Sequence, residues 1–182
     1  MGPCARSCRP RALLFLGGVF SLVGLFFAYF MQEKLFLMPC PLCIIQRYFA
    51  FLVVFLSAFA LVPCSCGHFV ALVMGFLFAF SGLCVGVYQV YLHIFPSAVS
   101  HCSVELSNLV NKIFLAKWFP KMFYSAGDCA VIQWRLFDVI TIPEISVAFF
   151  LSIVVLLGSG IFYAICARSC SGGDKSSGCH YS

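Results

Sequence analysis

Two cysteines at the start of an apolar run are followed by an arginine one helical turn later. Residues 39–47 read PCPLCIIQR, so Cys40 and Cys43 form a Cys-x-x-Cys pair and Arg47 lies four residues beyond the second cysteine. If a helix begins near Cys43, then Cys43 and Arg47 share one face and the first-turn N–H groups point toward the sulfur. A cation and a helix N-terminus both stabilise a thiolate. Because the thiolate is the reactive species in disulfide exchange, the spacing predicts redox chemistry.

The rest of the chain is hydrophobic enough to lie in a membrane. Of its 182 residues, 63% are hydrophobic and 9% are charged, and the mean hydropathy is +1.05, which is unlike a soluble domain. The net charge of +5 comes from basic residues scattered along an apolar chain, so no nucleic-acid partner is expected. A cation inside an apolar run costs roughly 2.5–3.5 kcal/mol. We therefore expect a strongly polar or anionic group beside Arg47.

Four apolar runs are each about as long as the 20 or so residues that a helix needs to cross a bilayer. They predict an all-α membrane protein with a four-helix transmembrane bundle in a single domain. The expected spans are residues 12–30, 44–62, 69–92 and 145–167. Residues 31–43 and 93–143 then form two loops on one side of the membrane, and residues 168–182 form a flexible tail on the other.

Three arginines before the first span favour a cytoplasmic N-terminus, and four spans place both termini on that side. Four cysteines then face outward, namely Cys40, Cys43, Cys102 and Cys129. Seven face the cytoplasm, namely Cys4, Cys8, Cys64, Cys66, Cys166, Cys170 and Cys179. The inner thiols are expected to be reduced, whereas Cys84 lies within the third span and acts as a small hydrophobic residue.

The long outer loop contains a short amphipathic helix. Its apolar residues recur at helical spacing and are Leu106, Leu109, Val110, Ile113 and Phe114. Ser103 is expected to cap this helix. We expect the helix to lie on the membrane plane, with Trp118, Phe119 and Trp134 as anchors at the interface.

Four thiols in an oxidising compartment are expected to form two pairs, most naturally Cys40 with Cys43 and Cys102 with Cys129. The first pair closes a very small loop, which suits a labile catalytic disulfide. The second bridges the long loop and serves either as a redox partner or as a structural staple. A zinc site at the first pair would need two more ligands. Although His101 lies beside Cys102, the loop provides no second Cys-x-x-Cys.

Two segments resemble signatures of one known family. Residues 40–47, CPLCIIQR, resemble the Cys-x-x-Cys-x-x-x-Arg signature of the disulfide bond formation protein B (DsbB) family. Residues 118–134, WFPKMFYSAGDCAVIQW, are similar to its second signature, and the order of spans and loops is similar from about residue 12 to residue 167. The resemblance implies a bacterial inner-membrane enzyme that reoxidises a periplasmic DsbA-like thioredoxin-fold oxidase. The electrons would pass to the respiratory quinone pool.

The resemblance also implies a role for each outer cysteine. A thiolate of the partner would attack Cys102 to give a mixed disulfide, and Cys129 would be the resolving cysteine. Cys40 and Cys43 would receive the electrons next. Cys43 would face the quinone, and Arg47 would stabilise both its thiolate and the charge that develops on a quinone oxygen. Ubiquinone and menaquinone present the same ring oxygens, so the sequence does not choose between them.

Three further polar residues are candidates for contact with the quinone, namely Gln46, Gln89 and His93. Some family members carry an acidic residue and a histidine together at the outer end of the third span, whereas residues 88–93 read YQVYLH here. Tyr48, Phe49 and Phe51 are expected to supply an apolar slot beside Cys43.

Two other functions compete with the quinone-linked oxidase. The inner thiols could serve a metal-binding or transport protein, since Cys166 and Cys170 lie one helical turn apart and Cys179 precedes a histidine. Alternatively, the outer disulfides are only staples in a structural four-helix protein. The oxidase is the main hypothesis, and it requires no metal.

Overall fold

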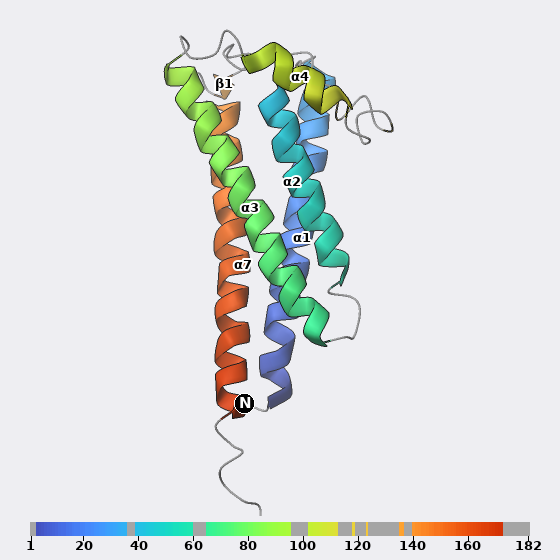
Figure 1. Cartoon of the computed structure of the whole chain (residues 1–182), viewed down its shortest axis with the longest axis vertical. Coiled ribbons are helices and arrows are strands. Elements are labelled where there is room, and N and C mark those ends of the chain that lie inside the picture. The colour runs from blue at the N-terminus through green and yellow to red at the C-terminus, as the bar shows by residue number, and fades with distance from the viewer. Residues whose placement is uncertain are drawn as a thin grey trace, which may run out of the picture.

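Four long helices make up most of the computed structural model. It describes residues 3–35, 39–59, 65–95, 102–112, 118, 123, 135–136 and 140–172. The long helices are α1 (Pro3–Leu35), α2 (Pro41–Ala58), α3 (Ser65–Ile94) and α7 (Ile142–Gly172). Each contains a segment long and apolar enough to cross a membrane (Figure 1). The predicted all-α class with four transmembrane helices is confirmed.

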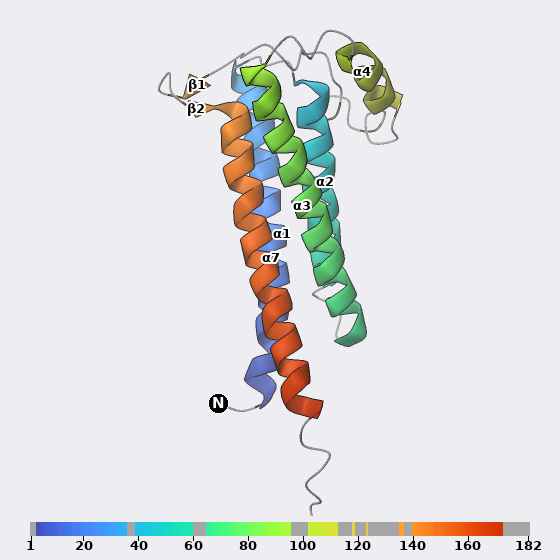
Figure 2. The same cartoon turned by 60° about the vertical axis from the view of Figure 1, so that its left-hand side comes forward.

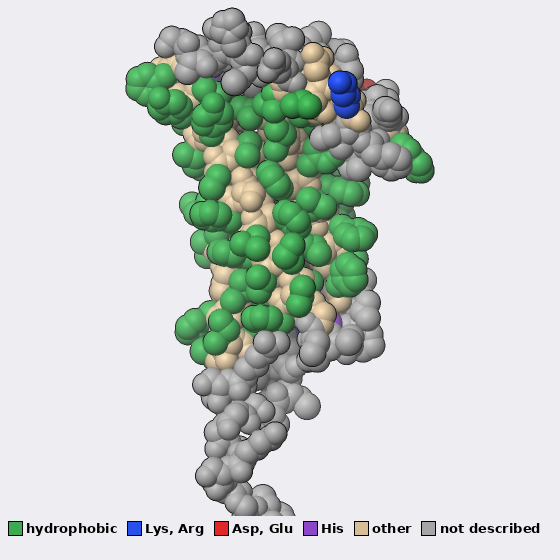
Figure 3. All heavy atoms as spheres, viewed as in Figure 1, with side chains coloured by type: hydrophobic (Ala, Val, Ile, Leu, Met, Phe, Trp, Pro, Cys, Tyr) green, Lys and Arg blue, Asp and Glu red, His purple; other side chains and the backbone are tan. Residues whose placement is uncertain are grey.

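The four helices pack side by side, with α2 and α7 each lying between α1 and α3. Leu14, Val53, Leu72, Ile153 and Leu157, at least one from each helix, fill the space between them. Other apolar side chains point outward, and they cover the flank of the bundle seen in Figure 3. An apolar flank is expected where the surrounding solvent is lipid.

Helix α2 begins earlier than the start near Cys43 that we expected from the sequence. Pro41 is its first residue and Cys40 is its N-cap, with φ −76° and ψ 159°. Proline suits this first position because its fixed φ is helical and its missing N–H would have no intrahelical acceptor. Cys43 therefore lies inside the first turn, while Cys40 lies at the cap.

Between α3 and α7, the described residues include a short helix and a small antiparallel sheet. Helix α4 (Cys102–Lys112) lies at the same end of the bundle as the start of α2 (Figures 1 and 2). Strand β1 (Arg135–Leu136) pairs with β2 (Ile140–Thr141), and the sequence analysis did not predict this pair. Glu144 accepts a 2.7 Å hydrogen bond from the backbone N–H of Thr141, which caps the start of α7.

Helix α4 differs in two respects from the predicted surface helix. Ser103 is inside its first turn, so the predicted cap is wrong, because the helix already begins at Cys102. Leu106 and Val110 pack against residues of α2, whereas Leu109 is exposed. Its position relative to a membrane plane stays a prediction. Trp118 is exposed, and the other expected loop positions, Ile113, Phe114, Phe119 and Trp134, lie outside the described residues.

Candidate functional site

The two cysteines of the Cys-x-x-Cys pair lie in contact at the start of α2. Both are in the thiol form, and their sulfurs are 2.7 Å apart. The backbone N–H of Cys43 also donates to Sγ of Cys40 at 3.3 Å, because the cap residue directs its side chain toward the first turn. Disulfide-bonded sulfurs lie about 2.05 Å apart. A small side-chain movement therefore brings this pair to bonding distance.

A glutamine from α3 contacts both sulfurs. Nε2 of Gln89 donates to Sγ of Cys40 at 3.3 Å and to Sγ of Cys43 at 3.2 Å. The Gln89 side chain is 3% exposed, so water competes little for these hydrogen bonds. The sequence analysis named Gln89 as a candidate for quinone contact. In the structure its donor group contacts the thiol pair, and its contact with a quinone stays a prediction.

Arg47 has the polar neighbours that its position in an apolar helix requires. Its NH1 group donates to Oε1 of Gln32 on α1 at 2.7 Å. Its positive charge also acts on the sulfurs of Cys40 and Cys43. We expected a strongly polar group beside Arg47, and the structure has two: the thiol pair at the start of the same helix and the amide of Gln32 on α1.

Three buried polar atoms at this end of the bundle have no hydrogen-bond partner among the described residues. They are Nε2 of Gln46, Oε1 of Gln89 and Nδ1 of His93. Gln46 faces α3, since its Nε2 lies 3.0 Å from the position that a Cβ on Gly86 would occupy. His93 follows Gln89 by one turn along α3. A buried polar atom without a partner is costly, which makes these atoms candidates for binding a water molecule or a ligand.

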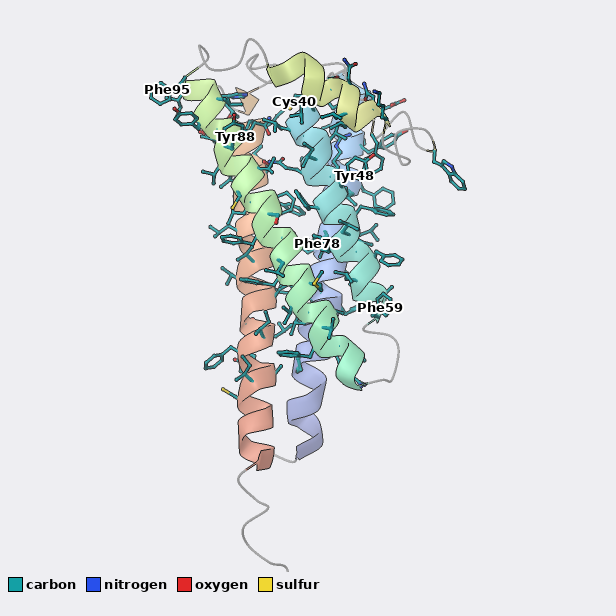
Figure 4. All side chains as sticks on the ribbon, viewed as in Figure 1. Cys40, Tyr48, Phe59, Phe78, Tyr88 and Phe95 are labelled. Atoms are coloured by element: carbon teal, nitrogen blue, oxygen red, sulfur yellow. The ribbon has the colours of Figure 1, made fainter. Side chains whose placement is uncertain are left out.

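The thiol pair is covered by apolar side chains. Cys40 packs with Leu42 and Leu92, and Leu106 of α4 joins this cluster. Figure 4 shows Cys40 at the start of α2, beside α4. Cys102 is the first residue of α4 and precedes Leu106, which packs on this cluster, by one helical turn. The side chain of Cys102, and all of Cys129, lie outside the described part of the chain.

An aromatic residue of the outer loop docks on the other side of α2. Phe123 is 2% exposed, and its ring centroid lies 4.8 Å from that of Tyr48 and 6.3 Å from that of Phe51. Phe49 stacks on Phe78 of α3. The three aromatics that were expected to form a slot beside Cys43 thus have their ring contacts with Phe123 and Phe78. The sequence analysis did not single out Phe123, although it lies within the second signature.

The described residues contain no group of three or more His, Cys, Asp or Glu side chains that could hold a metal ion. Cys84 and Cys166 are exposed thiols on α3 and α7. The other predicted inner thiols, Cys4, Cys8, Cys64, Cys66, Cys170 and Cys179, have side chains outside the described residues. A metal-binding role for them stays a prediction.

Comparison with known proteins finds matches along most of the chain. A family model described as disulfide bond formation protein DsbB matches residues 10–159. A disulfide bond formation protein B from Nitrosospira multiformis is 34% identical over 160 residues, which cover 84% of this chain and 93% of the relative. A protein of the same name from Methylobacillus flagellatus is 32% identical over 169 residues, covering 90% and 96% of the two chains. The range of the family model includes the thiol pair, all of α2 and α3, and most of α1 and α7.

Proposed function

The chain belongs to the DsbB family of disulfide bond formation proteins, and on that premise we propose that it reoxidises a periplasmic DsbA-like dithiol oxidase and passes the electrons to a quinone. Family membership and the four apolar helices make it a multi-pass membrane protein and a disulfide oxidoreductase. One observation carries the finer proposal. A thiol pair with sulfurs 2.7 Å apart shares a buried amide donor and lies in the field of an arginine.

The first exchange uses Cys102 and Cys129, which we assign as the second redox pair. A thiolate of the reduced partner attacks Sγ of Cys102, breaks the Cys102–Cys129 disulfide and releases Cys129 as a thiolate. The partner's second thiolate then attacks the partner's sulfur in the mixed disulfide. The partner leaves oxidised, and Cys102 and Cys129 are left reduced.

The second exchange carries the two electrons to the start of α2. A thiolate of the reduced second pair attacks Cys40 and expels Cys43 as a thiolate, and closure of Cys102 with Cys129 leaves Cys40 and Cys43 reduced. The packing of Leu106 of α4 against the cluster of Cys40, Leu42 and Leu92 supports this route. Arg47 and Gln89 stabilise the Cys43 thiolate as it leaves, since a cation and an N–H donor both stabilise a developing thiolate.

The polar residues near the pair fit a quinone. When bound there, a quinone would supply a two-electron, two-proton acceptor for the dithiol, and Cys40 and Cys43 would close to a disulfide again. The ring carries two carbonyl oxygens that need hydrogen-bond donors, and Arg47 and the unpartnered Nε2 of Gln46 are donors of the required kind. His93 and the carbonyl of Gln89 add buried polar atoms at the same end of the bundle.

We further propose that the Cys40 end of the bundle faces the periplasm of a bacterium and that both termini are cytoplasmic. The start of α1 and the end of α7 lie together at the opposite end of the bundle (Figure 1). The three arginines near the N-terminus support a cytoplasmic location for that end.

A coupled assay tests the proposed function. The full chain in lipid nanodiscs should reduce a soluble quinone analogue at the expense of a reduced thioredoxin-fold dithiol protein. Replacement of Cys102 by serine should block thiol consumption, whereas Arg47→Ala should slow quinone reduction and still allow the mixed disulfide with the partner to form. The exposed Cys84 offers a matched control, and Cys84→Ser should leave the rate unchanged.

The same assay can refute the proposal. If quinone reduction that depends on the thiol partner survives replacement of Cys40, Cys43, Cys102 and Cys129 together by serine, the chain does not act through these pairs.

A further inference from the structure

We propose that Gln32 is a positioning residue, which orients the guanidinium of Arg47 toward the thiol pair without neutralising its charge. The inference deepens the proposed function and rests on it, because it assigns Arg47 a role in stabilising the Cys43 thiolate. The sequence analysis did not single out Gln32, and neither family signature includes it.

The hydrogen bond between these residues joins two helices at the redox end of the bundle. Gln32 lies in the last turn of α1, which ends at Leu35, and Arg47 lies in the second turn of α2, which begins at Pro41. The 2.7 Å distance from NH1 to Oε1 is typical of a charge-assisted hydrogen bond. The guanidinium is planar and rigid, so holding one of its nitrogens restricts the orientation of the whole group.

The chemical type of residue 32 matters as much as its position. A carboxylate here would accept the same hydrogen bond, but it would also form an ion pair and cancel much of the field of Arg47 at the sulfurs. A neutral amide accepts the bond and leaves that field in place. Because the charge of Arg47 acts on both Cys40 and Cys43, the field is part of what makes the pair reactive.

The rate at which Cys43 is alkylated tests this role without a quinone. The fully reduced chain in nanodiscs is treated anaerobically with iodoacetamide at fixed neutral pH, and peptide mass spectrometry follows each cysteine. The variants are Gln32→Met, which removes the acceptor at similar size, and Gln32→Glu, which keeps the acceptor and adds a charge. Glu33→Gln is the matched control, since Glu33 is the exposed neighbour of Gln32. Cys166, exposed on α7, is the internal standard.

We expect both substitutions at Gln32 to slow alkylation of Cys43, with Gln32→Glu about tenfold slower, which corresponds to roughly 1.4 kcal/mol of lost thiolate stabilisation. Glu33→Gln and the rate at Cys166 should not change. In an Arg47→Met background, Gln32→Met should have no further effect, because the residue acts through the arginine.

A purely structural role predicts the opposite order. If Gln32 only ties α1 to α2, then Gln32→Glu keeps or strengthens the tie and should alkylate at the wild-type rate, which would overturn the proposal. A wild-type rate for Gln32→Met would overturn it as well. Since no quinone is present, either result leaves the coupled quinone assay to judge the proposed function separately.

Discussion

Gln89 gives the thiol pair a hydrogen-bond donor that does not titrate. Its amide nitrogen lies 3.3 Å from Sγ of Cys40 and 3.2 Å from Sγ of Cys43. Gln89 belongs to α3, whereas the thiol pair lies at the start of α2. An amide donates at any pH, whereas an imidazole donates from a given nitrogen only in one tautomer or when protonated. The pair therefore has a neutral donor beside it, and Arg47 provides a cation.

Removing this donor should slow the oxidase. We expect Gln89→Met to lower the turnover number by about 10- to 100-fold, because a hydrogen bond to a charged group contributes about 1.5–3 kcal/mol. The coupled quinone assay measures the effect. Tyr88→Phe is the control, since Tyr88 precedes Gln89 but points away from the bundle in Figure 4. An unchanged turnover in Gln89→Met would show that the contact with the sulfurs does not contribute.

The sequence predicts the part of the site that is local in the chain. Cys40, Cys43 and Arg47 lie within eight residues, so helical spacing alone places the last two on one face. Gln32, Gln89 and Phe123 come from other segments, and no periodicity connects them with the pair. Their contacts arise from the packing of α1, α3 and the outer loop against α2, which spacing within one helix does not determine.

At the scale of elements, α4 and Phe123 dock together against the start of α2. Val110 is 2% exposed and packs with Ile44 and Phe123, while Leu106 packs against the cluster of Cys40. Both contacts use the start of α2. The helix that begins with Cys102 is thus held over the thiol pair by side chains one turn apart.

A charge in this contact should uncouple the two pairs. In Val110→Asp the docking of α4 should weaken by about 1.5–3 kcal/mol, the value of burying one such side chain. Quinone reduction driven by the protein partner should therefore slow by at least about tenfold. Reduction driven by a small dithiol that reaches Cys40 and Cys43 directly should be unaffected.

Asn108→Asp is the control for this substitution, because Asn108 is an exposed residue of the same helix and acquires the same charge. If Val110→Asp slowed quinone reduction equally with the protein partner and with the small dithiol, the account would be contradicted. Such a result would place the defect at Cys40 and Cys43 rather than in the transfer between the two cysteine pairs.

The crossing of α3 and α7 depends on a glycine that faces a buried ring. A Cβ at Gly82 would overlap the side chain of Phe150, which is 2% exposed. We expect Gly82→Ala to lower the free energy of unfolding by about 1–3 kcal/mol, the usual effect of overpacking a core. Gly67→Ala on the same helix meets no atom within 4 Å and should not destabilise the protein. Unfolding by an increasing concentration of a denaturing detergent measures the stability of both variants. If Gly82→Ala were as stable as Gly67→Ala, the packing of Gly82 against Phe150 would be contradicted.

The long apolar runs of the sequence predict the four helices of the bundle, but they do not predict the residues at which the helices begin and end. The start of α2 at Pro41 depends on a local cap in which Cys40 accepts from the N–H of Cys43. The pairing of β1 with β2 joins residues of ordinary loop composition, and strands of two residues are too short to show an alternating pattern.

At the scale of the whole molecule, the residues that contact the thiol pair gather at one end of an apolar bundle. The thiol pair, Arg47 and the two glutamines that contact them all lie near the start of α2. The flank of the bundle is hydrophobic (Figure 3). Composition alone predicts this architecture, because a chain with 63% hydrophobic residues and four long apolar runs has few alternatives to a helical membrane bundle.

The central claim is that the dithiol of Cys40 and Cys43 gives its electrons to a quinone. A single-turnover experiment tests it: the fully reduced protein in nanodiscs is mixed anaerobically with a soluble quinone analogue, and thiol trapping with mass spectrometry follows the pair. We predict that Cys40 and Cys43 become a disulfide while one quinone is reduced per pair, and that Arg47→Ala slows this step. A pair that stays reduced in excess quinone would contradict the account.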